Sequence, residues 1–165
     1  MLTRDDIFAV LDGVMDPEVP VLSVMELGIV RDVEMDDARS VTVVVTPTYS
    51  GCPAMQVIEE DIVAALRARG VEHARVRTTY AQAWTTDWMS DEAKAKLEAY
   101  GIAPPGRVPT GDEGLISLRR RPDVVRCPYC KSADTELRSE FGSTACKSIR
   151  FCNACQQPFE QFKAI

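Results

Sequence analysis

Four cysteines near one end of the 165-residue chain are the side chains best suited to chemistry. They form two CxxC pairs, Cys127 with Cys130 and Cys152 with Cys155, and 21 residues separate the pairs. Two such turns can present four thiolates at the corners of a tetrahedron, which is the arrangement of closed structural Zn²⁺ sites. The spacing therefore predicts a structural zinc site, with a rubredoxin-like iron site of the same geometry as the alternative.

Cys146 is a fifth cysteine in the same region, six residues before Cys152. One interpretation is a small buried side chain, since free cysteine is among the most buried residue types. The other is a spare ligand, or a thiol that meets the metal of a partner.

Cys52 stands apart from the others, between Gly51 and Pro53, where a helix is expected to begin. At the N-cap of that helix, unpaired N–H groups and the helix dipole would favour the thiolate. A loop thiolate can hold iron or a cluster transiently; a buried capping cysteine is the alternative. The one histidine, His73, is not placed to serve Cys52 as a base, so a nucleophilic enzyme is not expected.

Asp16 and Glu18 flank Pro17 where the first expected helix ends. A solvated turn explains this pair without any chemistry. The alternative is a pair of carboxylates near Cys52 that helps to hold a metal.

The elements that must position these residues predict an α+β domain over residues 1–100. Apolar spacing, capping residues and β-branched content predict helices over 3–14, 53–69 and about 90–99, and strands over 28–36, 40–46 and 73–79. The first two strands are close enough for an antiparallel hairpin. Trp84 and Trp88 are expected to be packing anchors, with a docking surface as the alternative.

Residues 101–124 are expected to be a linker, because 101–114 alone hold three of the ten prolines and four of the nine glycines. A zinc ribbon over residues 125–165 would follow. Its phenylalanines alternate as the core residues of such a module would: Phe141, Phe151, Phe159 and Phe162.

Charge and hydropathy narrow the class of protein. Residues 1–114 hold 10 Lys+Arg and 20 Asp+Glu, whereas residues 115–165 hold 9 and 5. An acidic main body argues against nucleic-acid binding, which favours basic faces. No apolar run could span a bilayer, and MLTRDDIFAV places charge where a signal peptide needs an apolar stretch. A cytoplasmic protein without membrane partners is therefore expected.

Several segments together resemble the SufT-like family of metal–sulfur cluster assembly domains. They are Asp16–Glu18, Glu26–Val30, Thr46–Pro53 and, at the domain's end, Trp84–Ser90. The family's usual Asp-Leu-Gly is Glu26-Leu27-Gly28 in this chain. The resemblance implies a small mixed sheet with helices on it. It also implies that Cys52 is the best candidate for a transient iron or cluster ligand, with Asp16 and Glu18 weaker.

The full layout, with the ribbon, is similar to the PaaD (PaaJ) family of accessory proteins of the bacterial phenylacetyl-CoA epoxidase system. This implies a non-catalytic factor for iron or iron–sulfur cofactors in aerobic phenylacetate catabolism. Its partners would be the oxygenase or reductase subunits and the iron–sulfur assembly machinery. The alternatives are a structural or electron-relay subunit of that complex and a zinc-ribbon nucleic-acid-binding protein.

Overall fold

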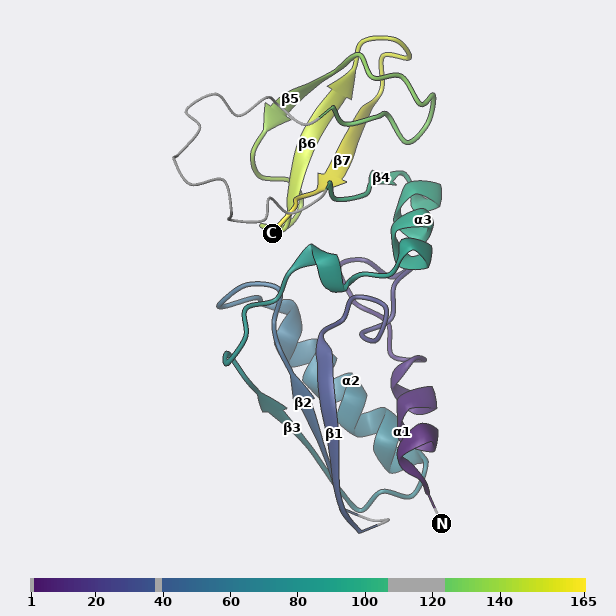
Figure 1. Cartoon of the computed structure of the whole chain (residues 1–165), viewed down its shortest axis with the longest axis vertical. Helices are drawn as coiled ribbons and strands as arrows, with labels where there is room; N and C mark the ends of the chain where they lie inside the picture. The colour runs from purple at the N-terminus through teal and green to yellow at the C-terminus, as the bar shows by residue number, and fades with distance from the viewer. Residues whose placement is uncertain (1, 38–39, 107–123) are drawn as a thin grey trace. The chain divides into compact units, whose positions relative to one another are not determined.

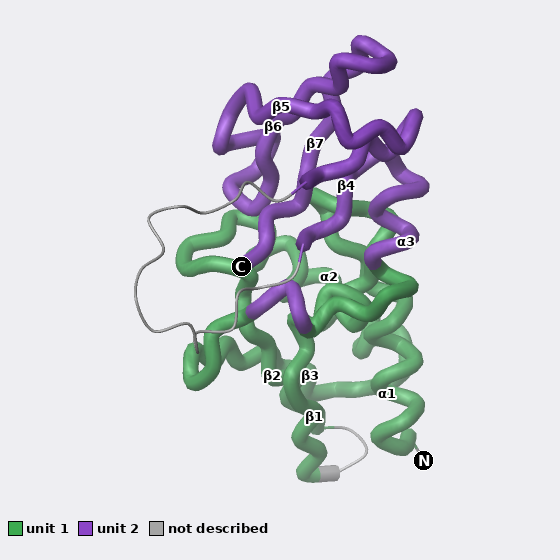
Figure 2. Tube along the Cα trace, turned by 45° about the horizontal axis from the view of Figure 1, so that its top comes forward, with its two compact units in different colours: residues 1–84, 88–93 green, residues 85–87, 94–165 purple. Residues whose placement is uncertain are grey.

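The computed structural model describes residues 2–37, 40–106 and 124–165. The chain forms two compact units, which Figure 2 shows in different colours. Unit 1 comprises residues 1–84 and 88–93, and unit 2 comprises residues 85–87 and 94–165. Within the described ranges, none of the helices has both the length and the apolar character needed to span a membrane.

Unit 1 is a three-stranded mixed sheet with two helices packed on it (Figure 1). The elements are α1 (Arg4–Leu11), β1 (Val30–Asp37), β2 (Ser40–Val45), α2 (Ala54–Ala68) and β3 (His73–Thr78). The strand order is β1-β2-β3, with β1 antiparallel and β3 parallel to β2. The predicted α+β class, the mixed sheet and the antiparallel hairpin are confirmed; the residues of the hairpin turn, 38–39, lie outside the described residues.

α1 begins where the sequence predicts and ends three residues early. The Thr3 hydroxyl accepts the Asp6 N–H at 3.2 Å, and the Asp6 carboxylate accepts the Thr3 N–H at 2.8 Å, which is a capping box. The Thr3 N–H and hydroxyl both donate to the Asp6 carboxylate and hold the pKa of that carboxyl below its ordinary value. At the other end the Val14 N–H bonds to the Leu11 carbonyl, a tighter turn that leads the chain out of the helix.

α2 ends in a Schellman motif. The Val71 N–H bonds to the Leu66 carbonyl and the Gly70 N–H to the Arg67 carbonyl, while Gly70 has a φ of +89°. Val71 and Leu66 are both buried, so the motif also fixes the path of the chain into β3. Gly70 therefore caps the helix as predicted.

The loops of unit 1 that carry the candidate residues gather at one end of the sheet. β2 and β3 are parallel and finish at this end, β1 starts there, and α2 begins there (Figure 1). The Thr46 N–H bonds to the Ile29 carbonyl at 2.8 Å, and the Thr79 N–H bonds to the Val45 carbonyl at 2.8 Å. Asp16, Glu18 and Cys52 all belong to loops at this end.

Unit 2 contains a four-stranded sheet. Its strands are β4 (Ile102–Ala103), β5 (Thr135–Ser139), β6 (Lys147–Cys152) and β7 (Pro158–Phe162), in the order β4-β7-β6-β5. α3 (Asp91–Tyr100) precedes the sheet, and the Ser90 hydroxyl caps it by accepting the Ala93 N–H. The short 3-10 helix η1 (Thr86–Trp88) begins in this unit, where the Thr86 N–H bonds to the Ile165 carbonyl.

The linker predicted over residues 101–124 does not begin at residue 101, because a strand follows directly. Ile102 and Ala103 form β4, which pairs in parallel with β7. Ala103 is 1% exposed and packs in the same core cluster as Val125 and Phe159. Ile102 and Ala103 are buried when they pair with the ribbon sheet, and this burial favours a strand although prolines follow directly in the sequence. The remainder of the expected linker falls largely in 107–123, outside the described residues.

The aromatic pattern of the ribbon is only partly a core pattern. Phe159 and Phe162 are buried, as predicted, and Phe151 is half-buried. Phe141 is 67% exposed, so its prediction as a core residue is wrong. It follows β5, and the ammonium group of Lys163 lies 4.9 Å from the centre of its ring, a cation–π contact at the surface.

Candidate functional site

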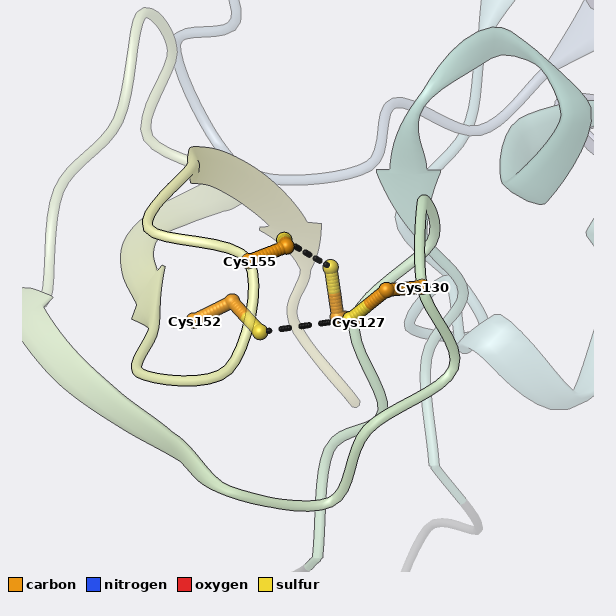
Figure 3. A group of neighbouring side chains, drawn as sticks. All are labelled: Cys127, Cys130, Cys152 and Cys155. Carbon is orange, nitrogen blue, oxygen red and sulfur yellow. Dashed lines mark hydrogen bonds between the residues drawn. The ribbon is translucent and has the colours of Figure 1, made fainter.

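The four CxxC thiols converge in unit 2 (Figure 3). Cys127 and Cys130 lie on the turn before β5, Cys152 is the last residue of β6, and Cys155 lies on the turn between β6 and β7. All four sulfur atoms lie within 4.8 Å of one another. The Sγ–Sγ distance is 3.7 Å from Cys127 to Cys155 and 3.5 Å from Cys130 to Cys152.

These distances suit a tetrahedral metal ion. Zn–S bonds of about 2.3 Å at tetrahedral angles separate two sulfurs by about 3.8 Å. The sulfur separations of 3.7 and 3.5 Å are close to that value. The structure thus brings together the four cysteines that the sequence singled out, as a group that could hold a metal ion.

Two matching backbone turns hold the thiols in place. The Lys131 N–H bonds to the Cys127 carbonyl and the Gln156 N–H bonds to the Cys152 carbonyl, each at 2.9 Å. Lys131 and Gln156 both have positive φ, of 65° and 58°. Neither residue is a glycine, so the sequence carries no signal for this conformation.

In the metal-free site the thiols differ in acidity. The Cys155 N–H donates to the Cys152 sulfur and, with further hydrogen bonds, lowers the pKa of that thiol to about 7. Burial, together with the neighbouring thiols, raises the pKa of Cys155 to about 12. A thiolate is therefore available at Cys152 near neutral pH, whereas Cys155 keeps its proton until a cation displaces it.

Cys146 is not one of the converging ligands in the part of the chain that the structure describes. It is 4% exposed, and its sulfur lies 3.0 Å from the Thr144 hydroxyl. The interpretation as a small buried side chain therefore fits the structure better than that of a spare ligand.

Cys52 lies one residue before the N-cap of α2 and is not the N-cap itself. The N-cap of α2 is Pro53, with a φ of −68°, so the prediction of Cys52 as the N-cap is wrong. Proline can take this position because it lacks an N–H group and its φ already suits a helix. The Cys52 carbonyl accepts the Met55 N–H, and the side chain is half-buried. The thiol thus stays beside the start of α2 and partly accessible.

Asp16 is a buried capping residue. It is 6% exposed, and its Oδ1 accepts the N–H groups of Glu18 and Val19, each at 2.7 Å. The interpretation of Asp16 as a residue of a solvated turn is therefore wrong. Cys52, Asp16 and Glu18 do not come close enough together to form a metal site in the described part of the chain. The group of metal-ligand side chains that does so there is the four ribbon thiols.

The Glu26 carboxylate closes a second capping box in the same loop region. It accepts the Ser23 N–H at 3.0 Å, and the Ser23 hydroxyl accepts the Glu26 N–H at 3.1 Å. The Ser23 hydroxyl also donates to Asp12 at 3.1 Å. A serine followed three residues later by glutamate is a signal for this arrangement, and it could have been identified in the sequence.

The two tryptophans anchor the loops of unit 1. Trp84 is 3% exposed, and its indole N–H donates to the Leu27 carbonyl at 2.9 Å. Trp88 is half-buried, with the guanidinium of Arg31 3.6 Å from its ring centre. The prediction of packing anchors is confirmed for Trp84, and Trp88 packs beneath a cation.

Comparison with known proteins covers both units. Residues 112–163 match the PaaD zinc beta ribbon domain, and residues 4–78 match the iron-sulfur cluster assembly protein family. A protein of Escherichia coli (strain K12) whose name makes it part of 1,2-phenylacetyl-CoA epoxidase is 42% identical over 161 residues. The alignment spans 97% of this chain and 92% of that protein. The chain belongs to the PaaD family.

Shorter relatives match unit 1 of this PaaD-family chain. An Fe-S protein maturation auxiliary factor of Porphyromonas gingivalis is 36% identical, over 58% of this chain and 90% of that protein. A crystal structure of a domain of unknown function from Bacillus anthracis is 29% identical, with a TM-score of 0.53, over 57% of this chain and 90% of that one. The structure of a conserved hypothetical protein from Thermotoga maritima is 34% identical, with a TM-score of 0.50. The match covers 58% of this chain and 94% of that one. These likenesses support the SufT-like fold predicted from the motifs.

Proposed function

We propose that this protein is a non-catalytic accessory factor of a phenylacetyl-CoA epoxidase system. It would help to supply iron or an iron–sulfur cluster to that complex in aerobic phenylacetate catabolism. The observation that carries the proposal is the match over 97% of the chain to a protein named as one of the epoxidase subunits. The match of residues 4–78 to the iron-sulfur cluster assembly family supports the maturation role.

Zn²⁺ is the proposed resident metal of the ribbon, bound by Cys127, Cys130, Cys152 and Cys155. The sulfur separations of 3.5 and 3.7 Å support it, because they suit zinc–thiolate bonds. Four protein thiolates complete a tetrahedron and leave no position open for a substrate. The metal would instead stabilise the ribbon, since a module of about 40 residues buries too little apolar surface to fold alone.

Cys52 is the proposed transient ligand for the iron or cluster that is delivered. Its half-buried side chain, on a loop at one end of the unit 1 sheet, supports this role. Asp16 is a weaker candidate, because backbone N–H groups already occupy its Oδ1. Glu18, half-buried on the same loop, is therefore the better candidate of the two carboxylates.

The proposed partners are the oxygenase or reductase subunits of the epoxidase, together with the iron–sulfur assembly machinery. A second function, as a structural or electron-relay subunit, follows from the name of the Escherichia coli relative, which calls that protein a subunit. A relay subunit would copurify with the oxygenase in a fixed ratio, whereas a maturation factor would not. The relatives offer no support for nucleic-acid binding, so we do not propose it.

Growth with phenylacetate as the carbon source tests the proposal. A strain that lacks the protein is complemented with the wild type, Cys52→Ser or Cys146→Ser. The Cys52→Ser protein should accumulate and keep its ribbon metal yet fail to support growth, and the Cys146→Ser control should restore it. Full growth with Cys52→Ser would contradict the role of this thiol.

A further inference from the structure

A groove in unit 1 lies between α2 and β3 and plays no part in the proposed metal chemistry. It is an open depression of about 410 Å³. Its apolar floor comes from Val63, Ala64 and Val76, and its lining also includes the charged side chains of Glu59, Glu60 and Arg67.

β3 forms one edge of the unit 1 sheet (Figure 1). On one side it pairs with β2, and in the described part of the chain no strand pairs with its other side. The backbone groups along a free strand edge can hydrogen-bond to a further strand. β3 is therefore a template for an added strand, and the groove lies beside it.

The side chains of β3 alternate in chemistry. Val76 faces α2 and lines the groove, in register with the buried Val43 of β2. Its neighbours Arg75 and Arg77 point to the opposite face of the sheet, because successive strand residues alternate. Both arginines are exposed, and Arg77 forms an exposed ion pair with Glu34.

We propose that β3 binds an extended peptide of a partner protein as a fourth strand, with an apolar residue flanked on both sides by acidic residues. The apolar residue would lie opposite Val76 and enter the groove. The two acidic residues would then face Arg75 and Arg77. The pattern is symmetric, so it fits either direction of the added strand.

Charge complementarity selects this partner. A short edge strand with two arginines resists unselective pairing, since cations on an edge oppose most added strands. Acidic side chains turn that repulsion into attraction. In such strand addition the main chain supplies affinity, and the alternate side chains supply specificity. The exposed Arg77–Glu34 pair is no obstacle, because exposed ion pairs contribute little and can be shared.

The test uses the full chain with its ribbon metal and a fluorescein-labelled peptide, Thr-Asp-Val-Glu-Val-Asp-Thr. At low salt the wild type should give a saturable rise in anisotropy. Arg75→Glu/Arg77→Glu should weaken binding at least tenfold and should bind the matching peptide with lysines in place of its acidic residues. Arg69→Glu, a single charge reversal outside the groove lining, should stay within twofold of the wild type. Equal binding of both peptides by the wild type would overturn the proposal.

Two further measurements separate strand addition from charge attraction alone. A peptide N-methylated at alternate residues keeps its charges but cannot pair along the edge, and it should bind at least tenfold more weakly. Ala64→Trp, at an exposed helix position on the groove floor, should weaken binding while α2 stays folded. Unchanged binding in either case would show that the peptide is not an added strand. Because neither measurement involves Cys52, failure here leaves the proposed maturation role untouched.

Discussion

Gly28 packs directly against the backbone of Trp88. A β-carbon at Gly28 would lie 2.9 Å from the β-carbon of Trp88 and 3.2 Å from its carbonyl oxygen, and Gly28 has a φ of +71°. Residues 26–28 thus pack against the segment that carries Trp84 and Trp88. The close contact and the positive φ of Gly28 fix the path of the chain between the two segments.

Gly28→Ala should destabilise unit 1 by about 2–4 kcal/mol, since it adds a steric clash to a strained backbone conformation. Gly51→Ala is the matched control, because Gly51 has a φ of +82° but nothing within 4 Å of the added carbon. It should cost only about 1 kcal/mol, from backbone strain. Urea unfolding followed by tryptophan fluorescence measures both. Equal losses of unfolding free energy in the two variants would show that the close approach to Trp88 does not penalise a β-carbon at Gly28.

Removal of the Asp16 carboxylate should act on stability. Asp16→Ala leaves the N–H groups of Glu18 and Val19 without their acceptor, which should cost about 1–3 kcal/mol. Asp16→Asn keeps an acceptor oxygen and should lose less. Unfolding and the metal content of the protein are measured together. A stable Asp16→Ala protein that has lost bound metal would contradict the capping role.

The sequence predicts the local elements better than the contacts that fix the loops. Capping residues and periodicity locate α1, α2 and the first three strands within a few residues, and CxxC spacing groups the four thiols. β4 could not be predicted from Ile102 and Ala103, because its pairing with β7 depends on residues far along the chain. The buried role of Asp16 depends likewise on how the turn after it folds.

The ion pair between Lys147 and Glu160 should contribute more to the stability of the ribbon than the exposed pair between Arg138 and Glu136 does. The two side chains are 4% and 28% exposed, and the ammonium nitrogen lies 3.2 Å from the carboxylate. Lys147→Met should destabilise unit 2 by about 1–3 kcal/mol, because it leaves the partly desolvated Glu160 carboxylate without its cation, although the Ser143 N–H still donates to it. Arg138→Met, in an exposed pair with Glu136, should cost only about 0–1 kcal/mol. Thermal unfolding of both zinc-loaded variants checks this; similar losses would contradict it.

Zinc affinity should rise with pH. The Cys155 thiol, with a pKa of about 12, is protonated in the metal-free site at every pH of interest, and Cys152, with a pKa of about 7, is protonated below neutrality. Metal must displace both of these protons, so affinity should fall by at least about 100-fold per pH unit between pH 7 and 5. Competition with a chromogenic chelator measures the slope. An affinity that does not change with pH would rule out thiolate ligation.

The metal content of the client tests the role of Cys52 most directly. The epoxidase is purified anaerobically from strains that carry the wild type, Cys52→Ser or Cys146→Ser, and its iron and acid-labile sulfide are counted. Maturation through Cys52 predicts an epoxidase deficient in iron or sulfide with Cys52→Ser and a full complement with Cys146→Ser. A fully loaded epoxidase from the Cys52→Ser strain would contradict it.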